Sequence, residues 1–200
     1  MKKSELERIL QKAPPHPSPD PSLEQYMTPA PVAAEALFFA AQCGDITGKA
    51  VGDLGCGTGI LAAGAGLLGA SRVVGIDIDE ASVVEARRFA DSLGLALDLV
   101  VGNIDVFHEE LDTVVMNPPF GAQRKHADRP FLRKAFECAA VVYSFHISET
   151  WEFVEREARG VGFTVTHKNK YRFAIKHMFE FHKKEKALID VTLFRMEGGR

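Results

Sequence analysis

Four residues near the middle of the chain, Asn117-Pro118-Pro119-Phe120, combine groups that could hold a planar amine. They follow an apolar run, residues 111–116, whose β-branched side chains predict a buried strand. Two successive prolines cannot continue a strand, because each lacks an N–H group and fixes φ. The chain must therefore leave the sheet at Asn117, at the end of a strand where α/β sheets bind ligands. There the Asn oxygen and a freed backbone carbonyl could accept both hydrogens of an amino group while Phe120 stacks on its ring.

A second group of candidate residues surrounds a glycine-rich turn. Gly55, Gly57 and Gly59 follow another expected strand, and Asp77 ends the next one. Glycines let a ligand approach the backbone closely, and an acid in this place accepts ribose hydroxyls, in dinucleotide and S-adenosylmethionine folds alike. The spacing is not that of a pyrophosphate turn, and Asp53 places negative charge beside the pocket. Both features favour S-adenosylmethionine, with its cationic amino acid part, over a nicotinamide cofactor.

Both motifs have a plainer reading. Asn and Pro are common turn residues, so Asn117-Pro118-Pro119 alone could simply end a strand. A tight glycine turn can likewise exist without a ligand. Each reading becomes weaker because the two motifs occur together.

The elements that must position these residues alternate between strands and helices. Thr28 is expected to cap a helix whose first residue is Pro29, and Ser148 is expected to cap a later one. The expected helices are 4–12, 29–43, 60–68, 80–93, 131–140 and 148–159, and the expected strands are 49–54, 72–76, 97–101, 111–116, 141–146, 164–168 and 187–195. This alternation predicts a three-layer α/β domain with a mostly parallel sheet.

The composition is that of one globular domain. The chain has 200 residues, 46% of them hydrophobic, and residues 23–200 are expected to form a single domain preceded by a helix and proline-rich arm at 1–22. No apolar run approaches the roughly 20 residues of a membrane span. The three cysteines suggest neither disulfides nor a zinc site, so a cytoplasmic location is expected.

The charge is unevenly distributed. The net charge of −3 argues against a nucleic-acid binder, but two basic stretches, 121–134 and 167–186, stand out. Aromatic residues interleave with the second stretch, which suits RNA, although a solvated face is the alternative and some of these rings must belong to the core. The candidate RNA-binding residues are Arg124, Lys125, Lys168, Lys170, Arg172, His182, Lys183 and Lys184.

No metal site is expected. None of the seven histidines pairs with another at a zinc-motif spacing. His16 lies in the proline-rich arm and is expected on the surface or facing RNA.

The combined motifs resemble class I S-adenosylmethionine-dependent methyltransferases that act on exocyclic or amide nitrogens. From about residue 20 to residue 195, further motifs look like the methyltransferase-like protein five family: Leu23-Glu24-Gln25-Tyr26 with Thr28, residues 75–79, 116–121, 142–146 and 181–184. That family methylates N6 of one adenosine in small-subunit ribosomal RNA. The resemblance implies a Rossmann-like, seven-stranded sheet with its last strand antiparallel.

The resemblance also implies residue roles. Gln25 and Thr28 would close over the cofactor, and Asn117 with the Pro118 carbonyl would hold the target amine beside Phe120. The candidate cofactor-binding residues are Gln25, Thr28, Asp53, Gly55, Cys56, Gly57, Asp77, Ile78, Asn103 and Asn117, and the candidate catalytic residues are Asn117, Pro118, Pro119 and Phe120. Asn103 stands where many relatives place an Asp that binds the adenine amino group. Relatives bind a small zinc-containing activator through an edge strand, which would be residues 97–101 here.

Two other functions remain open at this point. Asn-Pro-Pro followed by an aromatic residue also occurs in methyltransferases of a protein glutamine amide and of DNA adenine. A non-catalytic RNA-binding scaffold could retain a cofactor fold, although the intact motif residues argue against that reading.

Overall fold

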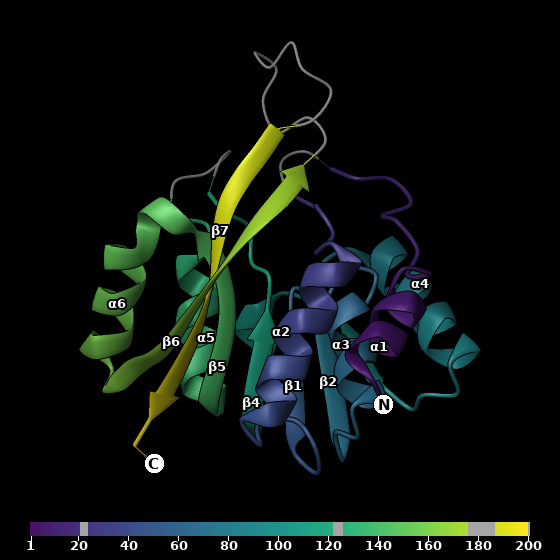
Figure 1. Ribbon diagram of the computed structural model, residues 1–200, viewed down its shortest axis with the longest axis horizontal. Coiled ribbons are helices and arrows are strands. Elements are labelled where there is room, and N and C mark those ends of the chain that lie inside the picture. Colours follow the sequence, from purple (N-terminus) through teal and green to yellow (C-terminus); the bar gives the residue numbers. More distant parts are fainter. Residues whose placement is uncertain (21–23, 122–125, 176–186, 200) are drawn as a thin grey trace.

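The computed structural model describes residues 1–20, 24–121, 126–175 and 187–199, which form a seven-stranded sheet in the order β3-β2-β1-β4-β5-β7-β6 (Figure 1). β7 is antiparallel to β5 and β6, and the other pairs are parallel. The strands are β1 Ala50–Leu54, β2 Arg72–Asp77, β3 Asp98–Val101, β4 Leu111–Met116, β5 Ala139–Ile147, β6 Phe163–Ile175 and β7 Ala187–Gly198. This is the Rossmann-like fold of class I methyltransferases, as the sequence predicted.

Helices cover both faces of the sheet. The helices are α1 Lys3–Leu10, α2 Ala30–Gln42, α3 Ile60–Leu67, α4 Glu80–Ser92, α5 Arg129–Cys138 and α6 Trp151–Gly160, with short 3₁₀ turns at Ile104–Val106 and Ser148–Thr150. The first four pack on one face and α5 and α6 on the other, so the sheet is the middle of three layers (Figure 1).

The two larger hydrophobic cores follow from the alternation of side chains along each strand. In β4, Val115 packs with the core under α1 to α3, whereas Val114 and Met116 pack with the core under α5 and α6. Leu6 and Leu10 of α1 are fully buried in the first core. The N-terminal helix is therefore packed onto the domain.

Some expected boundaries were wrong. Helix α2 begins at Ala30, so Thr28 is not its cap, and its side chain lies buried instead. Ser148 begins a 3₁₀ turn and its hydroxyl bonds to Thr192 (2.8 Å), so it does not cap α6. The helix expected at 131–140 and the strand expected at 141–146 are α5 and β5, each beginning two residues earlier.

The largest difference is in β6, which continues seven residues beyond the expected end at Lys168. It pairs with β7 along its whole length, with a bulge between Val165 and His167. β6 runs parallel to β4, so its carboxyl end lies at the same edge of the sheet as Asn117 (Figure 1). This edge therefore carries both sequence motifs and the end of a long hairpin.

None of the helices that the structure describes is long and apolar enough to cross a membrane. None of the three cysteines, all of which lie in the described ranges, forms a disulfide. The same ranges contain no cluster of His, Cys, Asp or Glu side chains suited to a metal ion.

Candidate active site

The glycine-rich turn connects β1 to α3 in a conformation that favours glycine. Gly55, Gly57 and Gly59 have φ angles of 74°, 51° and 83°, which side-chain-bearing residues rarely adopt. The N–H groups of Gly55 and Cys56 donate to the Ile76 carbonyl at 2.8 and 3.0 Å. The turn is thereby fixed against the end of β2.

Asp77, the last residue of β2, stands directly beside this turn. One of its carboxylate oxygens accepts the Gly57 N–H (2.7 Å), and the other accepts the Asp79 N–H (2.9 Å). These bonds hold the carboxylate in one orientation, and each oxygen retains a lone pair that could accept a ribose hydroxyl.

Asp53 is a buried acid at the floor of the site. Its Oδ2 accepts the N–H of Ala62 in the first turn of α3 (2.9 Å). Its Oδ1 is buried and has no hydrogen-bond partner among the described residues. Burial, opposed by the bond from Ala62, raises the pKa of Asp53 to about 8. A cation placed beside Oδ1 would satisfy this oxygen and favour the ionised form.

Asn117 lies at the end of β4 and faces the same pocket as Asp53. Its Oδ1 is also buried without a partner in the described part of the chain. The pocket is lined by His16, Tyr26, Met27, Thr28, Asp53, Gly55, Cys56, Gly57, Thr58, Ile60, Leu61 and Asn117. Buried polar atoms are nearly always satisfied, so two orphaned acceptors in one pocket indicate a ligand that brings donors or positive charge.

S-adenosylmethionine fits this set of hydrogen-bond acceptors. Asp53 offers an acceptor to its cationic part, Asp77 offers acceptors to its ribose, and the glycine turn permits close approach. Gln25 lies nearby, because its Nε2 donates to Asp79 Oδ2 (2.9 Å), and Thr28 lines the pocket.

The remaining expected cofactor residues, Ile78 and Asn103, follow β2 and β3. Ile78 is one of the large hydrophobic side chains that are exposed to solvent, with an exposed fraction of 57%. Asn103 Oδ1 accepts the Asp105 N–H (3.1 Å), which leaves one lone pair for an adenine amino group.

Phe120, expected to stack on the acceptor base, is only 7% exposed. Its ring centroid lies 4.8 Å from that of Tyr26 and 6.2 Å from that of Phe173. Its N–H donates to the Tyr26 hydroxyl (2.9 Å). Phe173 is itself a core residue, as expected of some aromatic rings in this stretch.

The proline-rich arm crosses the glycine turn, which the sequence did not reveal. The Thr58 hydroxyl donates to the Pro14 carbonyl (2.7 Å), and His16 Nδ1 lies 2.8 Å from the Ser82 hydroxyl. His16 therefore forms part of the pocket wall, where it is half-buried, and its expected contact with RNA stays a prediction. Desolvation lowers the pKa of His16, with Asp77 and Asp79 opposing the shift.

Three of the eight expected RNA-binding residues lie in the part of the chain that the structure describes. Lys168, Lys170 and Arg172 are exposed on β6, where Lys168 pairs with Glu155 (2.6 Å) and Arg172 with Asp190 (3.5 Å). Arg124, Lys125, His182, Lys183 and Lys184 lie outside the described residues.

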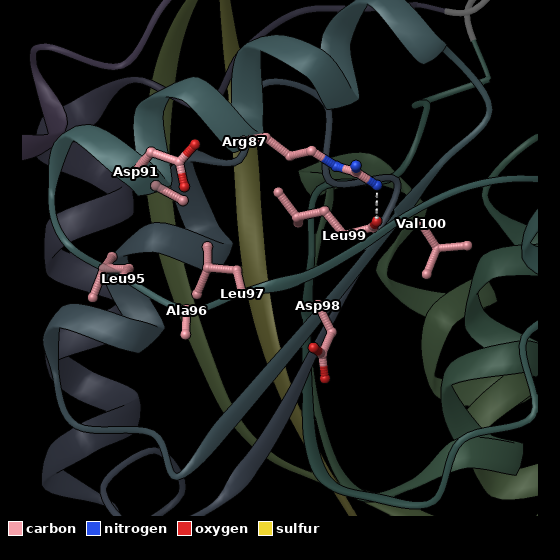
Figure 2. A pocket seen from close by; sticks show the side chains of 9 residues that line it. Arg87, Asp91, Leu95, Ala96, Leu97, Asp98, Leu99 and Val100 are labelled. Carbon is pink, nitrogen blue, oxygen red and sulfur yellow. Dashed lines mark hydrogen bonds between the residues drawn. The ribbon is translucent and has the colours of Figure 1, made fainter.

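The expected partner-binding strand is β3, an edge of the sheet. Val100 and Val101 are 44% and 46% exposed. Figure 2 shows a groove between this strand and α4, in which Arg87 donates to the Leu99 carbonyl (2.6 Å).

Several residues of the site had no cofactor or catalytic role assigned from the sequence, among them Glu24, Tyr26 and His16. Glu24 and Tyr26 stand within a motif that carried the family resemblance, so their position was the available signal. His16 gave no such signal, because its contacts lie far along the chain.

Known proteins resemble this chain over its whole length. The sequence model of the ribosomal protein L11 methyltransferase (PrmA) family matches residues 37–118. An uncharacterized protein of Methanocaldococcus jannaschii is 41% identical, covering 98% of this chain and 94% of its own length. The rRNA N(6)-adenosine-methyltransferase Mettl5 of Drosophila melanogaster is 34% identical, covering 100% and 98%.

A crystal structure from Pyrococcus horikoshii, described as that of a candidate RNA methyltransferase, is 41% identical with a TM-score of 0.94, covering 100% of this chain and 99% of the other. The PrmA match runs from the middle of α2 to Pro118, which covers most of the cofactor half of the fold and includes Asn117. It ends before Phe120 and the β6–β7 hairpin.

Proposed function

The chain belongs to the family of class I S-adenosylmethionine-dependent methyltransferases that includes Drosophila Mettl5, and we propose that it methylates N6 of an adenosine in small-subunit ribosomal RNA. Full-length similarity to named rRNA N(6)-adenosine-methyltransferases of the fly and of Danio rerio supports this acceptor. The observation that carries the proposal is the unpartnered, buried Oδ1 of Asn117 in a pocket shared with Asp53.

The cofactor half of the site would bind S-adenosylmethionine and orient its methyl group. Bound S-adenosylmethionine supplies an electrophilic methyl group. Asp77 and the glycine turn would hold the nucleoside part, and Asp53 would hold the positively charged part. Thr28, which is 2% exposed and lines the pocket, would help to exclude water.

The acceptor half must make a poor nucleophile reactive. The exocyclic nitrogen of adenine is conjugated with the ring, so its lone pair is only weakly available. The Asn117 oxygen and the Pro118 carbonyl would accept its two hydrogens and favour a pyramidal nitrogen whose lone pair points at the methyl group. Positioning and electrostatics would then suffice for an in-line displacement, in which the nitrogen–methyl bond forms as the sulfur–methyl bond breaks. The methylated nitrogen would lose its excess proton to solvent, so no dedicated base is required.

The hairpin supplies the surface for RNA. Lys168, Lys170 and Arg172 are exposed along β6, whose carboxyl end reaches the active-site edge. Lys and Arg side chains that bind the phosphates of RNA displace counterions from it. We therefore expect RNA binding to weaken steeply as the salt concentration rises. Arg124, Lys125, His182, Lys183 and Lys184, which lie outside the described residues, are proposed to contact RNA as well. Phe120 would stack on the target base.

Product analysis tests the acceptor directly. The protein is incubated with labelled S-adenosylmethionine and, in parallel, small-subunit ribosomal RNA lacking this modification, DNA, and ribosomal protein. We expect label in N6-methyladenosine from the RNA reaction after nucleoside digestion. Label in a glutamine side chain or in DNA, or no transfer to the RNA even after a small zinc-containing activator protein is added, would reject the proposed acceptor.

We further propose that the β3 edge takes a small zinc-containing activator protein by strand addition. The exposed Val100 and Val101 support this, because an apolar edge strand favours pairing with another chain. Val100→Lys should abolish capture of this partner and leave cofactor affinity unchanged. Equal capture by the variant in a pull-down with the purified activator would reject the site.

A further inference from the structure

The segment 24–28 touches both halves of the active site. Towards the cofactor, Met27 and Thr28 line the pocket, and Gln25 binds Asp79 (2.9 Å). Towards the acceptor, its other two residues contact the loop that follows β4. One short segment thus spans from the ribose side of the pocket to the catalytic motif.

The contacts to the acceptor loop form a small hydrogen-bond network. The Phe120 N–H donates to the Tyr26 hydroxyl oxygen (2.9 Å), and the Gly121 N–H donates to Glu24 Oε2 (3.1 Å). The Tyr26 hydroxyl in turn lies 3.5 Å from the same Glu24 oxygen and donates to it. Burial, with the neighbouring Glu24, raises the pKa of Tyr26 far above its ordinary value. The hydroxyl therefore keeps its proton and can donate and accept at once.

These two N–H groups are the first that the loop offers after Asn117. Pro118 and Pro119 have none, so no hydrogen bond from their own nitrogens can fix the direction of the chain. Phe120 and Gly121 follow at once, and both are bound from the 24–26 segment. The Tyr26 ring also packs against the Phe120 ring at 4.8 Å. Main chain and ring are therefore held from the same side.

We propose that Glu24 and Tyr26 form a clasp that positions the acceptor loop, with Tyr26 as a positioning residue for methyl transfer. This rests on the proposed function, because the aim of the Asn117 oxygen and the Pro118 carbonyl depends on where the loop is held. A displacement of about 1 Å in such a group can cost on the order of 10²-fold in rate.

Tyr26→Phe isolates the hydroxyl, because the ring and its contact with Phe120 remain. We expect hydrogen exchange of the Phe120 amide to become at least about tenfold faster, since its acceptor is lost. We also expect the single-turnover rate at saturating cofactor and acceptor to fall about tenfold, the effect of losing about 1.4 kcal/mol. Cofactor affinity measured by calorimetry should stay within about twofold, a change too small to count as lost binding.

Tyr171→Phe is the matched control. Tyr171 is a half-buried tyrosine of β6 whose hydroxyl has no hydrogen-bond partner in the described part of the chain. Its loss should change neither exchange at Phe120 nor the rate. Glu24→Gln keeps an oxygen for Gly121 but removes the charge, and should give a smaller rate loss than Tyr26→Phe.

Unchanged exchange and rate in Tyr26→Phe would overturn the proposal. So would an equal loss of cofactor affinity and rate, since that would mark a general structural role. The exchange measurement requires no acceptor, and the rate is compared on whichever acceptor the wild-type protein methylates. A failure of the RNA proposal is therefore distinguishable from a failure of the clasp.

Discussion

Replacing Asp53 by Asn should stabilise the cofactor-free protein and weaken cofactor binding. Asp53 is 1% exposed, and its pKa is raised to about 8 from an ordinary value of 3.8. The folded state therefore prefers the protonated carboxyl group. The raised pKa therefore contributes to the free energy of unfolding in full below pH 3.8, and this contribution is lost as the pH rises through about 8.

The size of the effect follows from the pKa. The raised pKa of about 8 lies about four pH units above 3.8. Each pH unit corresponds to about 1.4 kcal/mol, so the ionised carboxylate costs the folded state at most about 6 kcal/mol. Relaxation and water in the pocket reduce the cost of the buried charge. We expect D53N to gain about 2–4 kcal/mol over the wild type at pH 9 and almost nothing at pH 4. The Asn oxygen can still accept the Ala62 N–H.

Urea unfolding of the cofactor-free proteins at both pH values measures this gain. Asp91→Asn, at an exposed position of α4, is the control and should show no such dependence. Calorimetry should show cofactor affinity reduced by about 10- to 100-fold in D53N at pH 9, the range for a lost hydrogen bond to a charged group. D53N that is no more stable at pH 9, or that binds cofactor as tightly as the wild type, would refute this reasoning.

Two further predictions concern His16 of the proline-rich arm and the buried ion pair between Arg195 of β7 and Asp45. His16→Ala should weaken cofactor affinity by about three- to tenfold, the effect of one lost contact, because His16 forms part of the pocket wall; an unchanged calorimetric affinity would contradict this. In the wild type, Arg195 Nε lies 2.9 Å from Oδ2 of the buried Asp45. Arg195→Leu should lower the free energy of unfolding in urea by about 3–5 kcal/mol, because the buried Asp45 carboxylate loses the positive charge that balances it. A loss below about 1 kcal/mol, the level of an exposed ion pair, would contradict it.

The motifs that local chemistry determines were predictable. Gly55, Gly57 and Gly59 adopt the positive φ angles for which glycine is the favoured residue. Pro118 ends β4 because it cannot continue the hydrogen-bond ladder. The mostly parallel sheet followed from the alternation of strands and helices, and the antiparallel last strand followed from the family resemblance. The order of the strands was not predicted from the sequence.

Contacts between distant segments were not predictable from local patterns. The second half of β6 belongs to the basic stretch 167–186, which was interpreted as an RNA-binding segment with a solvated face as the alternative. It nevertheless pairs with β7 along its length. His16 meets Ser82 across 66 residues, and Tyr26 meets Phe120 across 94. Nothing in a sequence near His16 indicates such a partner.

The most direct test of the proposed chemistry is the single-turnover rate of methyl transfer to ribosomal RNA for the wild type and Asn117→Ala, with cofactor affinity measured on the same samples. If Asn117 holds the target amine, the rate should fall by about 10²–10³, while cofactor affinity changes by less than about tenfold. An unchanged rate would contradict the account, because Asn117 would then take no part in methyl transfer.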